Sequence, residues 1–217
     1  LELAARTEGH VFVITMGPDQ AREVLLEAVC MGAERGYLIS DRCFAGADVC
    51  ATSHTLSQGI RQSGTYDLIL CGKQTTDGDT AQVGAETAEF LGIAHGTNIL
   101  EVLETGDTFI TVRMNLENKI QTQKMELPCL LTVDKDVNTP RLPSYKRRIG
   151  MDPGCIKVMG LDDLEDRDSG HYGLKGSPTQ VERIFPPDKK TDKEMIEGTS
   201  RELATAMAAI LRKHKFI

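Results

Sequence analysis

The alternation of short apolar runs with helical patterns is the feature that most constrains how this chain can fold. Apolar runs rich in β-branched and aromatic residues lie at 11–15, 37–40 and 66–71, and each precedes a segment with helical apolar spacing. Such runs are typical of strands covered on both faces, and strands joined by helices form parallel sheets. The pattern predicts an α/β fold with a doubly wound parallel sheet.

The pattern changes after Gly92, where short strands follow one another without helices. Turn residues at 106–107 and 117–118 separate segments with β-forming character. The expected strands cover 99–103, 108–114, 119–127 and 128–133. We therefore expect an antiparallel addition to the parallel core.

The first residues have the pattern of a helix end rather than of a domain start. The chain begins with Leu1, residues 1–6 have helical character, and Gly9 precedes the first apolar run. A helix that leads into a buried strand is the second half of a β-α-β unit. We expect the first strand of the fold to be missing from this sequence.

The last third of the chain has no clear periodicity. We divide the sequence into an α/β domain at 1–137 and a partner-recognition loop with a C-terminal arm at 138–217. Such a stretch is either disordered or wraps a partner. The segment 191–194 has a capping-box pattern, which predicts a final helix. Its apolar stripe packs either on its own domain or on a second subunit, and it comprises Ile196, Leu203, Met207 and Ile210.

Composition excludes several classes of partner. The net charge of −7 argues against binding to nucleic acid or an anionic membrane surface. No apolar run approaches the roughly 20 residues that span a bilayer, so we expect no membrane insertion and a cytoplasmic location. The six cysteines form no C-x-x-C pair and the five histidines have no zinc-site spacing, so we expect reduced thiols and no metal site.

The most informative segment is the loop at 72–84, between an apolar run and a helical pattern. Ligands of open α/β sheets bind at the carboxyl ends of strands, and free N–H groups at a helix start favour anions. Small residues allow close approach of a phosphate, with neutral donors from Thr75, Thr76, Thr80 and Gln82. The loop predicts a nucleotide site; the alternative is a solvated turn. Its glycine spacing matches neither a P-loop nor G-x-G-x-x-G.

Other polar residues allow competing interpretations. Asp77 and Asp79 suit a metal or acid–base pair, but turn-forming and helix-capping carboxylates are the favoured interpretation. In the loop 40–48, Asp48 either caps the next helix or accepts from a ribose hydroxyl. Ser53-His54 lacks a nucleophile elbow, so we interpret it as a pair on a helix surface.

Three segments, at 16–21, 40–48 and 72–84, resemble motifs of the beta subunit of electron transfer flavoproteins, and 173–187 is similar to the tail of electron-bifurcating members. The resemblance implies an adenine nucleotide alpha-hydrolase-like fold and a heterodimer with an alpha subunit that carries FAD. The beta subunit of this family binds either FAD or AMP. The implied cofactor-binding residues are Met16, Asp48, Thr52, Ser53, Gly72, Lys73, Gln74, Thr75, Thr76, Asp77, Gly78, Asp79, Thr80, Ala81, Gln82 and Val83.

We favour FAD over AMP on two features. AMP-binding members tend to carry a bulkier, more acidic sequence where this chain has 78–81, and the S-P-T-Q tail resembles bifurcating members. The resemblance then implies that NADH delivers electrons to a bound FAD. One electron goes through the alpha subunit to an acyl-CoA or other flavin dehydrogenase, the other to ferredoxin or flavodoxin. No catalytic acid, base or nucleophile is implied.

The segment 140–146 resembles the family's loop for docking a dehydrogenase, with Leu142 as the apolar anchor beside Pro143 and Tyr145; the alternative is a Pro-rich linker. Val49 and Ala85 depart from the family pattern of Thr and Pro. Two other functions remain open. One is a subunit with structural AMP that shuttles electrons between dehydrogenases, and the other is a non-redox adenine-nucleotide-binding module.

Overall fold

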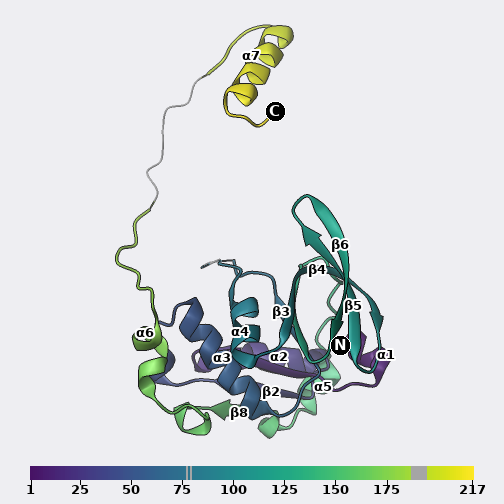
Figure 1. The fold of residues 1–217 in the computed structure, drawn as a ribbon, viewed down its shortest axis with the longest axis vertical. Coiled ribbons are helices and arrows are strands. Elements are labelled where there is room, and N and C mark those ends of the chain that lie inside the picture. The colour runs from purple at the N-terminus through teal and green to yellow at the C-terminus, as the bar shows by residue number, and fades with distance from the viewer. Residues whose placement is uncertain (77, 79, 187–194) are drawn as a thin grey trace. The chain divides into compact units, whose positions relative to one another are not determined.

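The computed structural model describes residues 1–76, 78, 80–186 and 195–217, which form two compact units, Leu1–Gln180 and Val181–Ile217. The described part of the second unit contains one helix, α7 (Ser200–Lys213). The first unit contains the other α-helices and the strands, most of which are labelled in Figure 1. In chain order they are α1 (Glu2–Thr7), β1 (Phe12–Met16), α2 (Arg22–Met31), β2 (Arg35–Ile39), α3 (Val49–Ser63), β3 (Leu68–Gly72), α4 (Val83–Leu91), β4 (Ala94–Thr105), β5 (Phe109–Leu116), β6 (Lys119–Glu126), β7 (Cys129–Val133), α5 (Tyr145–Ile149), β8 (Ile156–Met159) and α6 (Gly173–Gly176).

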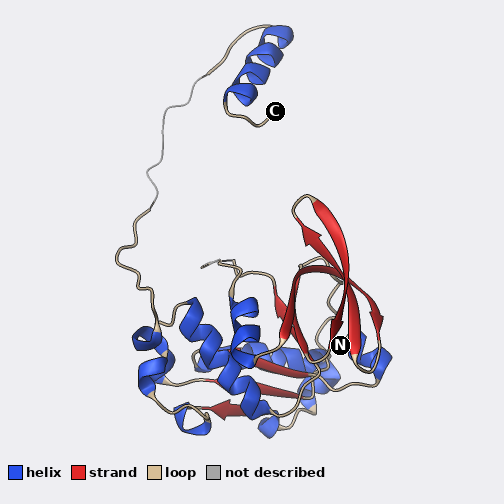
Figure 2. Cartoon of the chain, in the orientation of Figure 1, coloured by secondary structure: helices blue, strands red, loops and turns tan. Residues whose placement is uncertain are grey.

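The strands form two sheets, coloured red in Figure 2. The three-stranded sheet has the order β1-β2-β8 and is parallel throughout. The five-stranded sheet has the order β3-β7-β4-β5-β6, parallel from β3 to β4 and antiparallel from β4 to β6. The expected α/β class with an antiparallel addition is confirmed. The expected single parallel sheet is instead two hydrogen-bonded sheets within the described residues.

Both faces of the three-stranded sheet are covered, and β2 shows how. Leu38 points to the face where Leu25 and Val29 of α2 pack. Its neighbours Tyr37 and Ile39 point to the opposite face. Side chains alternate across a strand, so a continuous apolar run supplies two cores at once.

The five-stranded sheet is also covered on both faces. Cys129 and Leu131 of β7 contribute to a core with apolar residues of β4, β5 and β6. On the other face α4 lies so close that a Cβ on Gly84 would be 2.4 Å from Thr132 Cγ2. Glycine at this position therefore permits the helix to approach the strand. Helix α3 packs against α4 as well as β1 and β2, and so connects the two sheets.

Residues 138–180 differ most from expectation. They belong to the first compact unit, because β8 pairs in parallel with β2 and Tyr172 is fully buried in its core. Disorder is therefore the wrong interpretation for residues 156–177, whereas contact of the arm with a partner stays a prediction. The α/β unit extends to Gln180 and not to residue 137.

The final helix begins later than expected. A capping box between Thr199 and Glu202 precedes Ser200, so Ile196 lies before the helix and not on its stripe. The predicted capping box at 191–194 lies outside the described residues. Leu203, Met207 and Ile210 do lie on α7, where each is exposed by 36% or more. In the described part of the chain, no helix has the length and apolarity needed to cross a bilayer.

Candidate functional site

The predicted nucleotide loop follows the carboxyl end of a parallel strand. β3 ends at Gly72, and the Lys73 N–H donates to the Val133 carbonyl at the end of β7, at 2.9 Å. Lys73 Nζ lies 3.6 Å from Asp134 Oδ2, a partly exposed ion pair. The loop thus starts at the edge of the sheet where ligands of α/β proteins bind.

The loop leads into a helix whose first turn has no side-chain cap within the described residues. Gln82 is the N-cap residue of α4, and its side chain makes no capping hydrogen bond. Ala81, just before it, has a left-handed φ of 53°. The first N–H groups of such a helix end need an acceptor, which a phosphate supplies.

The side chains of this loop are open to solvent. Thr75, Thr76, Thr80 and Gln82 are all exposed. A Cβ at Gly72 or Gly78 would meet no atom within 4 Å, so the glycines leave room on one side of the loop. Gln74 is exposed as well, whereas the predicted residues Asp77 and Asp79 lie outside the described part of the chain.

The start of α3 lies against the start of α4. Ser53 is fully buried and its Oγ donates to the Val83 carbonyl at 3.3 Å. The interpretation of Ser53 as a surface residue is therefore wrong, since the close packing of two helices covers it. Thr52 is half-buried beside it. The structure thus brings the α3 residues and the α4 end of the loop together.

Asp48 caps α3, as one of its two sequence interpretations predicted. Its Oδ1 accepts from the Ala51 N–H at 3.0 Å, and its Oδ2 accepts from the N–H and hydroxyl of Thr179. Burial raises the pKa of Asp48, but the hydrogen bonds from Thr179 and Ala51 outweigh it and hold the pKa below its ordinary value. Contact with a ribose stays a prediction.

No sequence pattern indicated that the segment around Ser177 contacts the start of α3. The structure shows that it does. Ser177 Oγ accepts from the Asp48 N–H at 2.8 Å and donates to the Gly173 carbonyl at 2.7 Å. Only the resemblance of the S-P-T-Q motif pointed to this segment. Together, Ser177 and Thr179 fix the residue that begins α3.

Met16 lies in the other sheet, at the end of β1. It is partly buried against the core that contains Ile39 and Phe44. Its connection to the loop runs through α3, which packs on both β1 and α4. The structure therefore joins Met16 to the loop by shared packing on α3, and a direct adenine contact stays a prediction.

The described residues fit an adenine nucleotide or flavin nucleotide. The uncapped first turn of α4 offers N–H groups to a phosphate, and the exposed Thr and Gln side chains offer neutral hydrogen bonds. Glu86 Oε2 and Thr87 Oγ1 on α4 are buried without a hydrogen-bond partner in the described part of the chain. Sequence reasoning did not identify either residue.

The predicted docking loop presents its apolar side chains to solvent. Leu142 is 88% exposed and Tyr145 is 77% exposed. The loop is nevertheless fixed at its end, because the Ser144 N–H donates to the Cys30 carbonyl at 3.0 Å and the Ser144 hydroxyl caps α5. An exposed leucine on a fixed loop suits a docking role, which stays a prediction, as does that of Pro143.

Comparisons with known proteins agree with one another. The family model "Electron transfer flavoprotein domain" matches residues 1–159. The chain is 40% identical to the electron transfer flavoprotein subunit beta of Clostridium acetobutylicum, over 96% of this chain and 79% of that protein. It is also 40% identical to the caffeyl-CoA reductase-Etf complex subunit CarD of Acetobacterium woodii, over 96% and 79%. A third relative is the acryloyl-CoA reductase electron transfer subunit gamma of Anaerotignum propionicum, 36% identical over 99% and 82%.

Proposed function

Since this chain belongs to the electron transfer flavoprotein family as a beta subunit, we propose that it serves electron bifurcation in a cytoplasmic complex with an alpha subunit. In this proposal electrons from NADH are divided between a flavin dehydrogenase and a ferredoxin or flavodoxin. The α/β unit would be of the adenine nucleotide alpha-hydrolase-like type. Relatives named as parts of a caffeyl-CoA reductase complex and an acryloyl-CoA reductase support a dehydrogenase of the CoA-ester class as partner.

The observation that carries the proposal is the open start of α4 beside the loop of neutral side chains. The N–H groups that follow Gln82 have no side-chain cap within the described residues, and Thr75, Thr76 and Thr80 are exposed in the loop that precedes them. These groups would hold the phosphates of a bound FAD. When bound, FAD would supply the redox chemistry, because flavins exchange electrons singly and in pairs.

The protein residues have a positioning role in this proposal. Ser53 fixes the start of α3 against α4, and Asp48 fixes α3 to the tail. The described residues would therefore bind and orient the nucleotide from two helix ends at once. AMP offers a single phosphate to the same N–H groups, so the test must distinguish bound AMP from bound FAD.

The deciding experiment measures nucleotide content of the protein co-expressed with its alpha subunit. Heat-released FAD and AMP are separated by chromatography and counted per heterodimer. We expect two FAD and no AMP. One FAD and one AMP would contradict bifurcation and leave an electron shuttle, and a heterodimer without flavin would contradict any redox role.

A coupled assay tests the electron path separately. NADH oxidation by the complex is followed with ferredoxin and a CoA-ester reductase, each omitted in turn. Bifurcation requires both acceptors, so we expect ferredoxin reduction only when the reductase and its substrate are present. Ferredoxin reduction without the second acceptor would overturn the proposal.

A further inference from the structure

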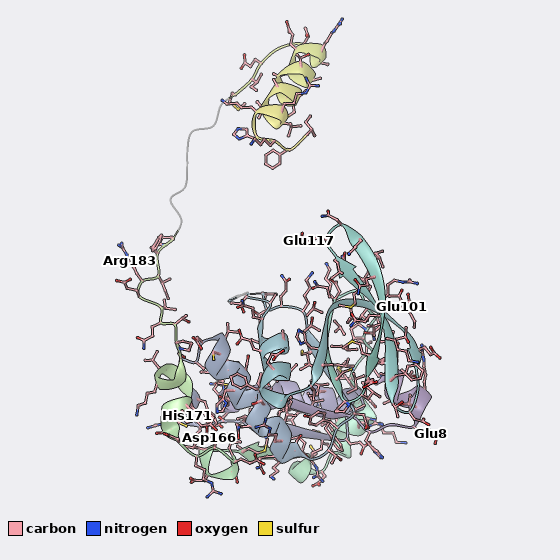
Figure 3. The ribbon with its side chains drawn as sticks, in the orientation of Figure 1. Glu8, Glu101, Glu117, Asp166, His171 and Arg183 are labelled. Carbon is pink, nitrogen blue, oxygen red and sulfur yellow. The ribbon has the colours of Figure 1, made fainter. Side chains whose placement is uncertain are left out.

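Two histidines and an aspartate that are distant in the sequence meet beside α3. His54 lies on α3, Asp166 follows β8, and His171 ends a short 3-10 helix. His54 Nε2 is 3.2 Å and His171 Nδ1 is 2.7 Å from Asp166 Oδ2. Figure 3 shows Asp166 and His171 side by side in the first unit.

The separations suit three ligands of one metal ion. The three ligand atoms all lie within 4.8 Å of one another. Zinc binds imidazole nitrogen and carboxylate oxygen at about 2.0–2.2 Å, so neighbouring ligand atoms of a tetrahedral site lie about 3.3–3.6 Å apart. The His54–Asp166 separation of 3.2 Å lies near this range, whereas the His171–Asp166 separation of 2.7 Å lies below it. Side-chain rotations that part His171 from Asp166 would therefore be needed to admit an ion.

The backbone and one carboxylate oxygen of Asp166 are held by hydrogen bonds outside the cluster. The Asp166 N–H donates to Oε1 of buried Gln58, and its carbonyl accepts from the Tyr172 hydroxyl. Its Oδ1 accepts from the Asp168 N–H at 3.0 Å. Burial raises the pKa of Asp166, but hydrogen bonds from Asp168, His171 and His54 outweigh it, so the pKa lies below its ordinary value. Such outer bonds orient the ligands of protein metal sites.

A pocket of about 350 Å³ adjoins the cluster. It is lined by His54 and His171 together with Cys50, Phe90 and Lys175. The His54 ring packs against the rings of Phe90 and Tyr172, with distances of 5.3 Å and 5.1 Å between ring centroids. These contacts limit the rotation of the His54 ring. The side of the cluster that faces the pocket is therefore accessible to an additional ligand.

We propose that His54, Asp166 and His171 bind one divalent transition metal ion, of which Zn²⁺ best matches the ligand set. Two imidazoles and one carboxylate are ligands that zinc accepts, with a further position left for water or another ligand. That position faces the pocket, where the Lys175 ammonium favours an anionic ligand such as a carboxylate or phosphate. None of the three ligands belongs to the loop at 72–84, although His54 follows Ser53 on α3. The site would add a metal centre to the subunit.

The test titrates the chelator-treated heterodimer with Zn²⁺ by calorimetry and compares H171Q with H10Q. His171 is the variant position because its side chain is 60% exposed, so we expect its replacement to leave the protein folded. His10 is the matched control: its Nδ1 also lies 2.7 Å from a carboxylate, Glu34, yet it belongs to no three-ligand group in the described part of the chain.

We expect one Zn²⁺ site in the wild type and in H10Q that H171Q weakens by at least about tenfold, since loss of a single outer-shell partner already costs 10–100-fold. Zn²⁺ should also raise the melting temperature of the wild type and H10Q, and raise that of H171Q less. Equal Zn²⁺ affinity in H171Q and the wild type, or no saturable binding in the wild type, would overturn the proposal and leave a hydrogen-bonded triad with a structural role.

Discussion

The carboxylate of Asp48 binds Thr179, a residue 131 positions later in the chain. The Thr179 hydroxyl donates to Oδ2 at 2.7 Å and its N–H donates to the same oxygen at 2.9 Å. The other oxygen caps α3 through the Ala51 N–H. The start of α3 and the S-P-T-Q tail are therefore one structural feature, although the sequence presents them as two separate motifs.

Replacement of Asp48 by alanine should destabilise the first unit. D48A removes a helix cap, which typically costs about 1 kcal/mol, and also both bonds to Thr179. We expect a fall of about 1.5–3 kcal/mol in the free energy of unfolding, measured by urea denaturation. T179V removes only the hydroxyl bond and should cost about 1 kcal/mol. A D48A protein as stable as the wild type would contradict the double role.

The same carboxylate should give the protein an acid-sensitive stability. The folded pKa of Asp48 lies below its ordinary value of 3.8, so its contribution is complete above that value and is lost as pH falls through the folded pKa. The stability difference between wild type and D48N should stay constant from neutral pH to about pH 5 and shrink in stronger acid. T179V should show a smaller acid-induced loss, because one of the bonds that lower the pKa is absent. If the stability difference between wild type and D48N grew as the pH fell, the folded pKa of Asp48 would be raised and not lowered.

Gly173 should not tolerate a side chain. Its φ is +53°, and a Cβ would lie 2.1 Å from the Cys43 carbonyl oxygen and 2.7 Å from that of Ala45. G173A should therefore lose more than about 2 kcal/mol of stability, from backbone strain and the clash together. G92A is the matched control, since Gly92 has a φ of +71° but open space around it, and should lose only about 1 kcal/mol. Equal losses in thermal or urea unfolding would show that the contact with the Cys43 segment is unimportant.

The strands and helices could be predicted wherever a local signal defines them. Asp48 at the start of α3 and Gly92 after α4 mark helix ends by capping chemistry, and both lie where the sequence placed a boundary or a candidate cap. β8 escaped prediction because it has only four residues, includes Lys157, and lies in a proline-containing stretch. Its identity as a strand comes from pairing with β2, a long-range interaction that no local pattern reports.

The candidate site was predictable only in part for the same reason. The loop after β3 follows a general rule about the carboxyl ends of strands, so it was visible in the sequence. The cluster of His54, Asp166 and His171 was not, because 112 residues separate His54 from Asp166 and no ligand spacing marks the set. The fold, and not the spacing along the chain, brings these side chains together.

Leu142 should be essential for docking of the flavin dehydrogenase and dispensable for folding. It is 88% exposed, so L142A should leave the unfolding free energy unchanged within about 0.5 kcal/mol. A buried apolar anchor of an interface typically contributes 2 kcal/mol or more, so we expect about 30-fold weaker binding to the dehydrogenase. I120A, at a position 65% exposed on β6, is the control and should bind normally. Calorimetry with the purified partner decides, and equal affinities for both variants would exclude the docking role.

A negative charge at the start of α4 should separate helix stability from nucleotide binding. Gln82 is the N-cap residue and makes no capping bond, so Q82D should cap the helix and stabilise the protein by about 0.5–1 kcal/mol. The same carboxylate would occupy the N–H groups that a phosphate needs and would repel it, since like charges about 4 Å apart interact by several kcal/mol near a protein surface. We expect at least a tenfold loss of affinity for FAD or AMP.

N115D, with the same new carboxylate at an exposed position of β5, controls for charge alone. Nucleotide retention after gel filtration and urea unfolding are measured on the same heterodimers. Increased stability with unchanged retention would remove α4 from the nucleotide site, whereas opposite changes in the two quantities would place the phosphate at its first turn.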